Sequence, residues 1–305
     1  MPSARPPRPV RPVRRRPDRY HHGDLRRALL LEAVRTIHAE GASGLTLRGV
    51  GDRLGVSRTA LYRHFADKQA LLDEVAAEGF RMLRAALHEA WGRGGRAGFD
   101  AMGIAYVHFA VAHPSHYRVM FGGLAARHQA TPADAEGAAA LTLRGVGDRL
   151  GVSRTALYRH FTDKQALLDE VAAEGFRMLR AALRESWGRG GRAGFDAMGV
   201  AYVHFAETHP SHYRVMFGGA AKTREAGPDA VDESTDAFQV LVDAIVAEQA
   251  AGRVRREDPQ ALALYIWAMV HGVAMLALDD LLPPPTTPDI LARLAIARMH
   301  GGIDG

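Results

Sequence analysis

Residues 46–65 read TLRGVGDRLGVSRTALYRHF, and this stretch decides the fold. Thr46 is placed to cap a short helix, Gly55 to end it, and Ser57 to cap a second short helix. Short helix, glycine turn and short helix is the layout of a helix-turn-helix, in which the second helix enters the major groove of DNA. The stretch therefore predicts a helical DNA-binding element.

The second short helix carries side chains that suit DNA. Arg58 can bind the O6 and N7 edge of guanine, and Thr59 can donate to a base, accept from it, or contact a thymine methyl. Tyr62, His64 and Lys68 flank the apolar positions of the helix, where they can reach phosphates. We expect base contacts at the start of this helix and backbone contacts along it.

The chain contains a long internal repeat. Residues 39–123 (copy 1) and 135–219 (copy 2) align at a constant offset of 96, with eight mismatches in 85 positions. A tandem duplication, or an error in the assembled gene sequence, explains such close copies. Only copy 1 follows the helical stretch Asp24–Glu40, and only copy 2 precedes the long segment Pro228–Gly305. Each copy therefore lacks what flanks the other.

We call each helix-turn-helix element a reading head. The asymmetry predicts that the head of copy 1 binds DNA well and that the head of copy 2 binds it poorly. The two short helices of copy 2 lack the apolar stripe that Leu29, Val34 and Ile37 supply to copy 1. Giving the first helix to copy 2 instead requires closing a loop 96 residues longer, which favours copy 1 by about fiftyfold. We expect copy 2 to bind DNA weakly or not at all. The same argument gives the C-terminal helices to copy 2 and leaves the Leu72–Phe121 face of copy 1 short of partners. We expect this half-domain either to pack against the rest of the chain or to be sticky.

Hydrophobic periodicity predicts an all-α fold, because each periodic segment has helical spacing and none alternates like a strand. Beyond copy 2, the middle of three further helices is apolar nearly all round, which is typical of a buried helix. The expected helices are 24–40, 46–54, 57–65, 67–91, 99–112 and 116–121, their repeats from Thr142 onward, 229–251, 259–278 and 288–300.

Composition excludes several classes of protein. The 305 residues include no cysteine, which rules out disulfides and thiolate chemistry and suits a reducing cytoplasm. Residues 1–20 hold seven arginines and six prolines, and predict an extended basic arm that either solubilises the chain or follows DNA phosphates. The longest apolar run, Ala261–Val270, ends at His271 and Gly272, so we expect no membrane span.

Catalytic and metal sites are not expected. The sequence has no phosphate loop, nucleophile elbow, HExxH motif or paired carboxylates outside charged helix faces, which excludes the common enzyme signatures. His113 and His116, repeated as His209 and His212, straddle a proline-broken helix junction without a carboxylate or cysteine partner. We predict neither an enzyme nor a metal or cofactor site.

Six segments carry a recognisable pattern: Tyr20–Arg26 (YHHGDLR), Gly44–Arg48 (GLTLR), Leu54–Ser57 (LGVS), Leu61–Leu72 (LYRHFADKQALL), His209–Phe217 (HPSHYRVMF) and Trp267–Gly272 (WAMVHG). Together they resemble tetracycline-repressor (TetR/AcrR) type regulators, and in particular one branch of that family, whose C-terminal domain carries a Trp-His-Gly motif. The resemblance covers nearly all of residues 20–300 apart from the repeat.

The resemblance implies an all-helical homodimer that reads a palindromic DNA operator and holds a small-molecule effector. In copy 1, backbone contacts fall to Thr46 and Arg48, base contacts to Arg58, Thr59 and Ala60 beside Ser57, and phosphate contacts to Tyr62, His64 and Lys68. Copy 2 offers Thr142, Arg144, Arg154, Thr155, Ala156, Tyr158, His160 and Lys164. The expected effector-binding residues are Met198, Tyr202, Phe205, Tyr213, Phe217, Phe238, Trp267, His271 and Met275.

The implied domains follow the repeat. They are a disordered arm at 1–20, a helix-turn-helix domain at 21–66, a partial ligand-type domain at 67–127, a linker at 128–140, a truncated helix-turn-helix at 141–162 and a ligand-binding and dimerisation domain at 163–305. The expected function is a cytoplasmic, sequence-specific repressor that its effector releases. The alternative is a DNA-binding or scaffold protein that reads no sequence and whose duplicated half is inactive.

Overall fold

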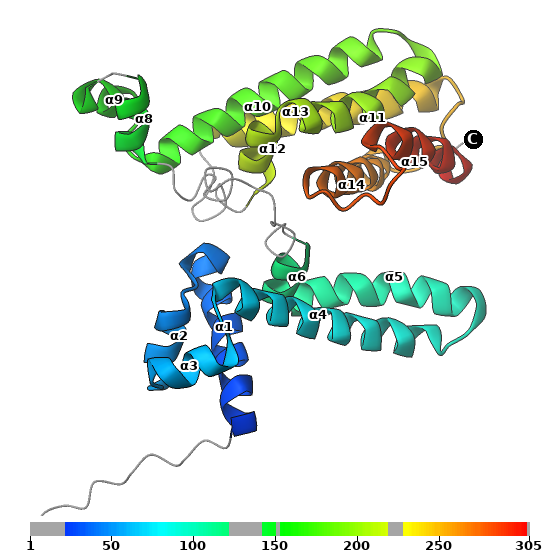
Figure 1. Cartoon of the computed structure of the whole chain (residues 1–305). Helices are drawn as coiled ribbons and strands as arrows, with labels where there is room; N and C mark the ends of the chain where they lie inside the picture. Colours follow the sequence, from blue (N-terminus) through cyan, green and yellow to red (C-terminus); the bar gives the residue numbers. More distant parts are fainter. Residues whose placement is uncertain (1–21, 122–141, 151–152, 219–227, 304–305) are drawn as a thin grey trace, which may run out of the picture. The chain divides into compact units, whose positions relative to one another are not determined.

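The computed structural model describes residues 22–121, 142–150, 153–218 and 228–303 (Figure 1). Every element in these ranges is an α-helix, which confirms the predicted all-α class for them. The chain forms two compact units, Met1–Met120 and Phe121–Gly305. The expected arm at 1–20 and linker at 128–140 lie outside the described residues.

Unit 1 begins with three helices packed as a small bundle and continues into a long antiparallel helix pair. Leu29 and Ile37 of the first helix are buried with Leu61 of the third. Arg26 donates a 2.7 Å hydrogen bond to Glu74, which fixes the first helix against the fourth. The elements are α1 (His22–Gly44), α2 (Leu47–Leu54), α3 (Arg58–His64), α4 (Lys68–Trp91), α5 (Gly95–Ala112) and α6 (Pro114–Phe121).

Two helix boundaries in unit 1 are set by glycine. α1 is assigned to Gly44, but Gly41 has a φ of +73°, so the regular helix ends there, as the sequence predicts. α5 begins at Gly95, four residues earlier than expected, because the left-handed turn is confined to Gly94 and Gly95. A Cβ on Gly98 would lie 2.9 Å from the Trp91 carbonyl oxygen, so this glycine lets α5 pass close to the end of α4.

Unit 2 consists of a short helix pair followed by a six-helix domain with one continuous hydrophobic core. In that domain α10 packs against α11, α12 and α13, and α11 also packs against α14 and α15. The elements are α8 (Leu143–Leu150), α9 (Arg154–His160), α10 (Lys164–Trp187), α11 (Gly191–Thr208), α12 (Pro210–Phe217), α13 (Pro228–Ala250), α14 (Pro259–Leu278) and α15 (Pro288–Ile303).

Two predictions about the C-terminal helices need correction. α15 runs three residues past His300, because Ile303 is buried and its carbonyl accepts a 2.8 Å hydrogen bond from the Arg255 backbone. α14 includes His271 and Gly272, so among the described residues it is the one helix long and apolar enough to cross a membrane by length and composition. The apolar stretch is therefore longer than the run Ala261–Val270, and α14 packs against α11, α13 and α15 within the domain.

Candidate DNA-reading heads and ligand pocket

Three local devices form the α2–α3 pair. The hydroxyl of Thr46 accepts a 3.0 Å hydrogen bond from the backbone N–H of Gly49 and so caps α2. Gly55, with a φ of +66°, ends α2 in the left-handed region. The hydroxyl of Ser57 accepts a 3.3 Å hydrogen bond from Ala60 and caps α3. The three predicted end signals of the helix-turn-helix are confirmed.

Packing then fixes which side of α3 faces outward. Leu61 and Phe65 are buried in the bundle core. A Cβ on Gly51 would approach Leu61 Cδ1 to 3.3 Å, so this glycine allows α3 to cross closely over α2. The inner face of α3 is thereby held, and the polar residues between its apolar positions remain on the surface.

The outer surface of α2 and α3 carries the expected DNA-contacting side chains. Ser57, Arg58 and Thr59 are exposed at the start of α3, Ala60 is half-buried, and Tyr62 is exposed. Thr46 and Arg48 are exposed on α2, where Arg48 lies 3.6 Å from Asp52 across one helical turn. This arrangement presents the N-terminal end of α3 as base-reading chemistry requires.

Lys68 and His64 differ from the simple expectation of exposed phosphate ligands. Both residues are half-buried. The ammonium of Lys68 donates a 3.3 Å hydrogen bond to the carbonyl oxygen of Ser43, and burial lowers its pKa. An ammonium has three donors, so Lys68 can bind a phosphate while it also ties α4 to the chain that enters α2.

The second head, formed by α8 and α9, repeats part of this arrangement. The hydroxyl of Thr142 caps α8 by accepting a 3.0 Å hydrogen bond from Gly145. The expected contact residues whose side chains are described lie on the surface, with Lys164 half-buried; the side chains of Arg154 and Ala156 lie outside the described ones. Phe161 is only partly buried, whereas its counterpart Phe65 is fully buried. The exposed contact residues are Thr142, Arg144, Thr155, Tyr158 and His160.

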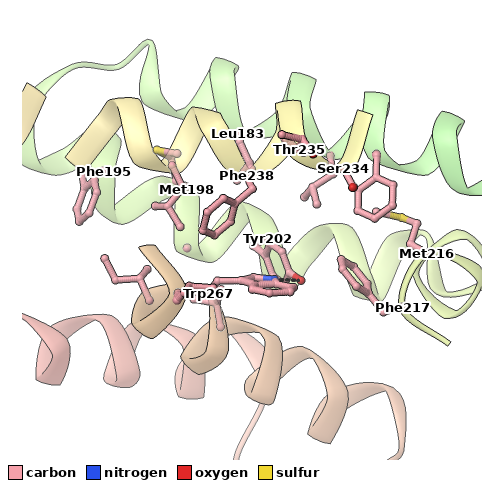
Figure 2. Close-up of a pocket in the computed structure, with 18 of the residues that line it drawn as sticks. Leu183, Phe195, Met198, Tyr202, Met216, Phe217, Ser234, Thr235, Phe238 and Trp267 are labelled. Atoms are coloured by element: carbon pink, nitrogen blue, oxygen red, sulfur yellow. Dashed lines mark hydrogen bonds between the residues drawn. The ribbon is translucent and has the colours of Figure 1, made fainter. Parts of the chain in front are cut away.

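Unit 2 contains a cavity of about 440 Å³ among α10–α15, and Figure 2 shows its aromatic lining. Most of the side chains that line it are apolar, and none carries a charge among those the structure describes. The lining residues are Phe176, Leu179, Leu183, Phe195, Met198, Gly199, Tyr202, Met216, Phe217, Ser234, Thr235, Ala237, Phe238, Leu241, Leu264, Ile266, Trp267, Val270, Ile296 and Met299.

Five of the nine expected effector-binding residues line this cavity, namely Met198, Tyr202, Phe217, Phe238 and Trp267. The other four are placed elsewhere. Phe205 is buried and stacks on His209, with ring centroids 4.9 Å apart. Met275 is exposed on α14, and Tyr213 and His271 lie behind the lining residues, in contact with Tyr202.

Tyr213 and His271 belong to a hydrogen-bonded cluster that supports the cavity. The indole Nε1 of Trp267 donates to the Tyr202 hydroxyl at 3.0 Å, and the Tyr213 hydroxyl donates to the same oxygen at 3.1 Å. Both hydroxyls lie within hydrogen-bonding distance of His271 Nδ1, at 2.9 and 2.6 Å. Burial raises the pKa of Tyr202 to about 12 and also raises that of Tyr213, so both phenols stay neutral.

Sequence reasoning missed the α10 and α15 walls of the cavity, and on the α13 wall it identified only Phe238. Leu183 on α10 corresponds to an apolar position of copy 1, so its pattern indicates only a core helix. Ser234 and Thr235, which supply hydroxyls at the α13 wall, stand in a polar stretch with no recognisable motif. The apolar positions of α13 were the one available signal, because a helix must bury such a stripe.

The histidines at the two proline-broken junctions contact nearby side chains. His116 Nε2 lies 3.5 Å from a carboxylate oxygen of Glu78, and the ring of His113 is tilted against Phe109. His209 stacks on Phe205 and meets His212 edge to face. No group of three potential metal ligands occurs among the described residues.

α14 and α15 expose a continuous apolar surface, which we call the C-terminal face. Its largest side chains are 39–54% exposed, although α14 is otherwise a core helix. Spacings of three and four residues place them on one side of each helix. The face consists of Ala261, Leu264, Tyr265, Ala268, Met275 and Leu276 on α14 and Ile290, Leu294 and Ala297 on α15.

Known families match both parts of this architecture. The profile described as "Bacterial regulatory proteins, tetR family" matches residues 29–75 and 133–171, which include both heads. The profile described as "Tetracyclin repressor-like, C-terminal domain" matches residues 195–299, which include most of the cavity. The second match of the tetR profile falls on copy 2, in agreement with the internal repeat.

Individual relatives are similar over shorter stretches. Tetracycline repressor protein class C of Escherichia coli is 45% identical over 51 residues, which are 17% of this chain and 23% of that protein. The class A repressor from transposon 1721, also of Escherichia coli, is 48% identical over 44 residues, 14% and 20% of the two chains. The chain thus spans less than a quarter of the length of the curated relatives it matches.

A protein of unknown function from Rhodococcus sp. RHA1 has a solved structure similar to this one at 22% identity and a TM-score of 0.45, covering 94% of this chain and 98% of that one. The matched residues include the capped α2–α3 pair and most of the helices around the cavity. Matched by these two profiles over more than half of its length, the chain belongs to the tetR family of bacterial regulatory proteins.

Proposed function

We propose that the protein is a sequence-specific DNA-binding regulator whose working reading head is α1–α3. The capped α2–α3 pair carries this proposal, because its packing turns Arg58 and Thr59 toward the surface at the start of α3. Membership of the tetR family supports the same reading. Double-stranded DNA with a palindromic operator is the proposed partner, and repression is the proposed effect.

The proposed residue roles follow from position on the head. Arg58, Thr59 and Ala60 meet base edges, because they begin the helix that enters the groove. Tyr62, His64 and Lys68 hold phosphates on one side, and Thr46 and Arg48 hold them on the other, with Ser57 as the cap between. The equivalent set of copy 2, from Thr142 to Lys164, contributes little, since α1 supports only the first head.

The cavity in unit 2 is the proposed effector site. Its lining is aromatic and aliphatic, with hydroxyls at Ser234 and Thr235 and no charged side chain among the described residues. Uncharged, largely apolar molecules of a size to fill about 440 Å³ fit this chemistry best. Trp267 and His271, which sit at and behind the cavity wall, support assignment of the chain to the branch of the family with the Trp-His-Gly motif.

The C-terminal face is the proposed homodimer interface. Two copies of the α14–α15 face would form a four-helix bundle about a two-fold axis, which is how such apolar pairs are commonly buried. An effector would act by favouring a domain orientation in which the α1–α3 heads of the two subunits no longer match the spacing of the operator half-sites. The proposed location is the cytoplasm, where the DNA of a bacterial regulator is, and the proposed domain limits are those predicted from the sequence.

Selection of bound duplexes from a random pool tests the function. A palindromic sequence should be enriched and should bind at least about a hundredfold tighter than random duplex of equal length, because base contacts add several kcal/mol. Without any enrichment, the chain is a DNA-binding or scaffold protein that does not read sequence. Titrations in increasing salt separate the two, since only phosphate contacts weaken steeply with salt.

A further inference from the structure

The α4–α5 helix pair of copy 1 exposes a face that its duplicate in copy 2 buries. Phe99 is 69% exposed whereas its counterpart Phe195 is 4% exposed, and Val107 is 57% exposed whereas Val203 is 1% exposed. We call this surface the copy-1 face. It consists of Phe80 and Trp91 on α4 and Phe99, Ile104 and Val107 on α5, each 48–69% exposed.

The cover on copy 2 is the set of helices α13–α15, and three contacts define how it fits. α13 runs along α10 (Figure 1), where Arg180 pairs with Glu233 at 3.0 Å and also with Asp236. A Cβ on Gly199 would lie 2.8 Å from Ile296 Cδ1, so α15 passes closely over this glycine of α11.

The copy-1 face retains each of the features that α13–α15 use. Arg84, the counterpart of Arg180, is exposed in the middle of the α4 stripe. Gly103, the counterpart of Gly199, has open space where its Cβ would be. The hydroxyls of Tyr106 and Tyr117 lie 3.0 Å apart, as those of Tyr202 and Tyr213 do at 3.1 Å. The acceptor surface for α13–α15 is therefore already formed in unit 1.

Charge complementarity and the number of helix sets in each chain indicate what binds the copy-1 face. Arg84 presents the same charge as Arg180, which pairs with two carboxylates spaced i and i+3, Glu233 and Asp236 of α13, so these helices are complementary to the copy-1 face. Each chain has one set of α13–α15, and in this structure it packs on α10–α11. We propose that the copy-1 face binds helices α13–α15 of a second copy of the chain, by exchange of these helices between molecules.

Energetics allow the exchange without a large penalty. The five side chains of the copy-1 face expose roughly 500 Å² of apolar surface, an area typical of interaction sites. The helices move between two faces that differ at few positions, so the two arrangements lie close in free energy. Exchange would rebuild the cavity on α4, the helix that follows the intact head. This consequence rests on the proposed function, whereas the docking itself does not.

A thiol-protection experiment in trans tests the docking, and the absence of native cysteine makes the probe clean. The acceptor chain carries Val107→Cys. The donor chain is full-length and carries Gly103→Leu and Gly199→Leu, because leucine at either glycine would block α15 and leave α13–α15 without a face. Saturating donor should slow alkylation of the acceptor's single introduced thiol by about tenfold.

Three controls make the result specific. Gly103→Leu in the acceptor should abolish protection, and Glu233→Arg with Asp236→Arg in the donor should reduce it strongly, since Arg84 then meets like charge. Val203→Cys in the donor background should react freely, which verifies that its helices have left α10–α11. Helix content by circular dichroism checks that each variant is folded.

An unchanged alkylation rate of the acceptor thiol at saturating donor would overturn the proposal. Equal protection by the wild-type chain and by the charge-reversed donor would overturn it too, because it would show that two copy-1 faces bind each other. Protection that is present before any donor is added, and that does not respond to it, would assign the cover to the same chain instead of a second copy.

Discussion

The indole Nε1 of Trp267 donates a 3.0 Å hydrogen bond to the hydroxyl of Tyr202, and both rings line the cavity of unit 2 (Figure 2). The two residues lie on α14 and α11, so the bond joins a helix of the C-terminal face to the opposite wall of the cavity. Because the polar atoms of both side chains already bind each other, a molecule in the cavity would contact mainly their ring surfaces. This supports the proposal that the effector is apolar.

Alkaline pH should destabilise the fold through this cluster. Burial raises the pKa of Tyr202 to about 12, above its ordinary value near 10, so the folded state keeps the phenol proton longer than the unfolded state. The stabilisation is complete below pH 10 and is lost as the pH rises toward 12, by up to about 1.4 kcal/mol per pH unit. Urea unfolding at pH 8 and 11 measures this loss. Tyr202→Phe should show a shallower fall, and an equal fall would contradict the assignment.

Filling the cavity should block binding of neutral apolar molecules. Leu183→Trp adds a larger ring to the α10 wall, and we expect the affinity for a neutral dye such as Nile red to drop about tenfold. Fluorescence titration gives the affinity. Leu87→Trp is the matched control, because Leu87 is the half-buried counterpart of Leu183 on α4 and does not line this cavity. If both variants bind the dye alike, this cavity is not the binding site.

A charge on the C-terminal face should separate the dimer. Leu294→Glu places a carboxylate in the proposed interface, and we expect a monomer in sedimentation experiments at micromolar concentration. Val246→Glu on α13 is the control, since Val246 and Leu294 are both 49% exposed and differ in the face on which they lie. Neither variant should lose helix content. A wild-type chain that is itself monomeric at these concentrations would refute the interface.

Two substitutions in the first head should weaken DNA binding in different ways. Arg58→Ala should cost about 1–3 kcal/mol on the selected operator and relax the preference at one base pair per half-site. Lys68→Ala should weaken binding to all sequences alike and lower the slope of log affinity against log salt by about one unit. Gel shifts at several salt concentrations measure both effects, and identical salt slopes for the two variants would contradict these roles.

Local features of the fold could be predicted because short-range chemistry decides them. Thr46 and Ser57 cap α2 and α3, and Gly55 ends α2, within three residues of the groups they bind. The end of α15 could not be predicted in this way. Its last turn is held by the contact of the Ile303 carbonyl with Arg255, 48 residues earlier in the chain.

The residues that line the cavity were predicted only in part, because its walls come from helices distant in the sequence. Aromatic character and the family resemblance predicted Tyr202 and Trp267, and both line the cavity. They could not separate these from Tyr213, which has the same character but lies one layer deeper. Ser234 and Thr235 gave no sequence signal, since a polar pair on a helix is usually solvated.

The central claim is that α1–α3 reads the operator and that α8–α9 does not. A single gel-shift comparison tests it, with the double variants Tyr62→Ala/Lys68→Ala and Tyr158→Ala/Lys164→Ala on the same selected palindrome. The first should lose at least about a hundredfold in affinity, because it removes two phosphate contacts per half-site, while the second should bind within about twofold of wild type. Equal losses in the two variants would contradict the account, since they would show that the truncated head reads DNA as well as the intact one.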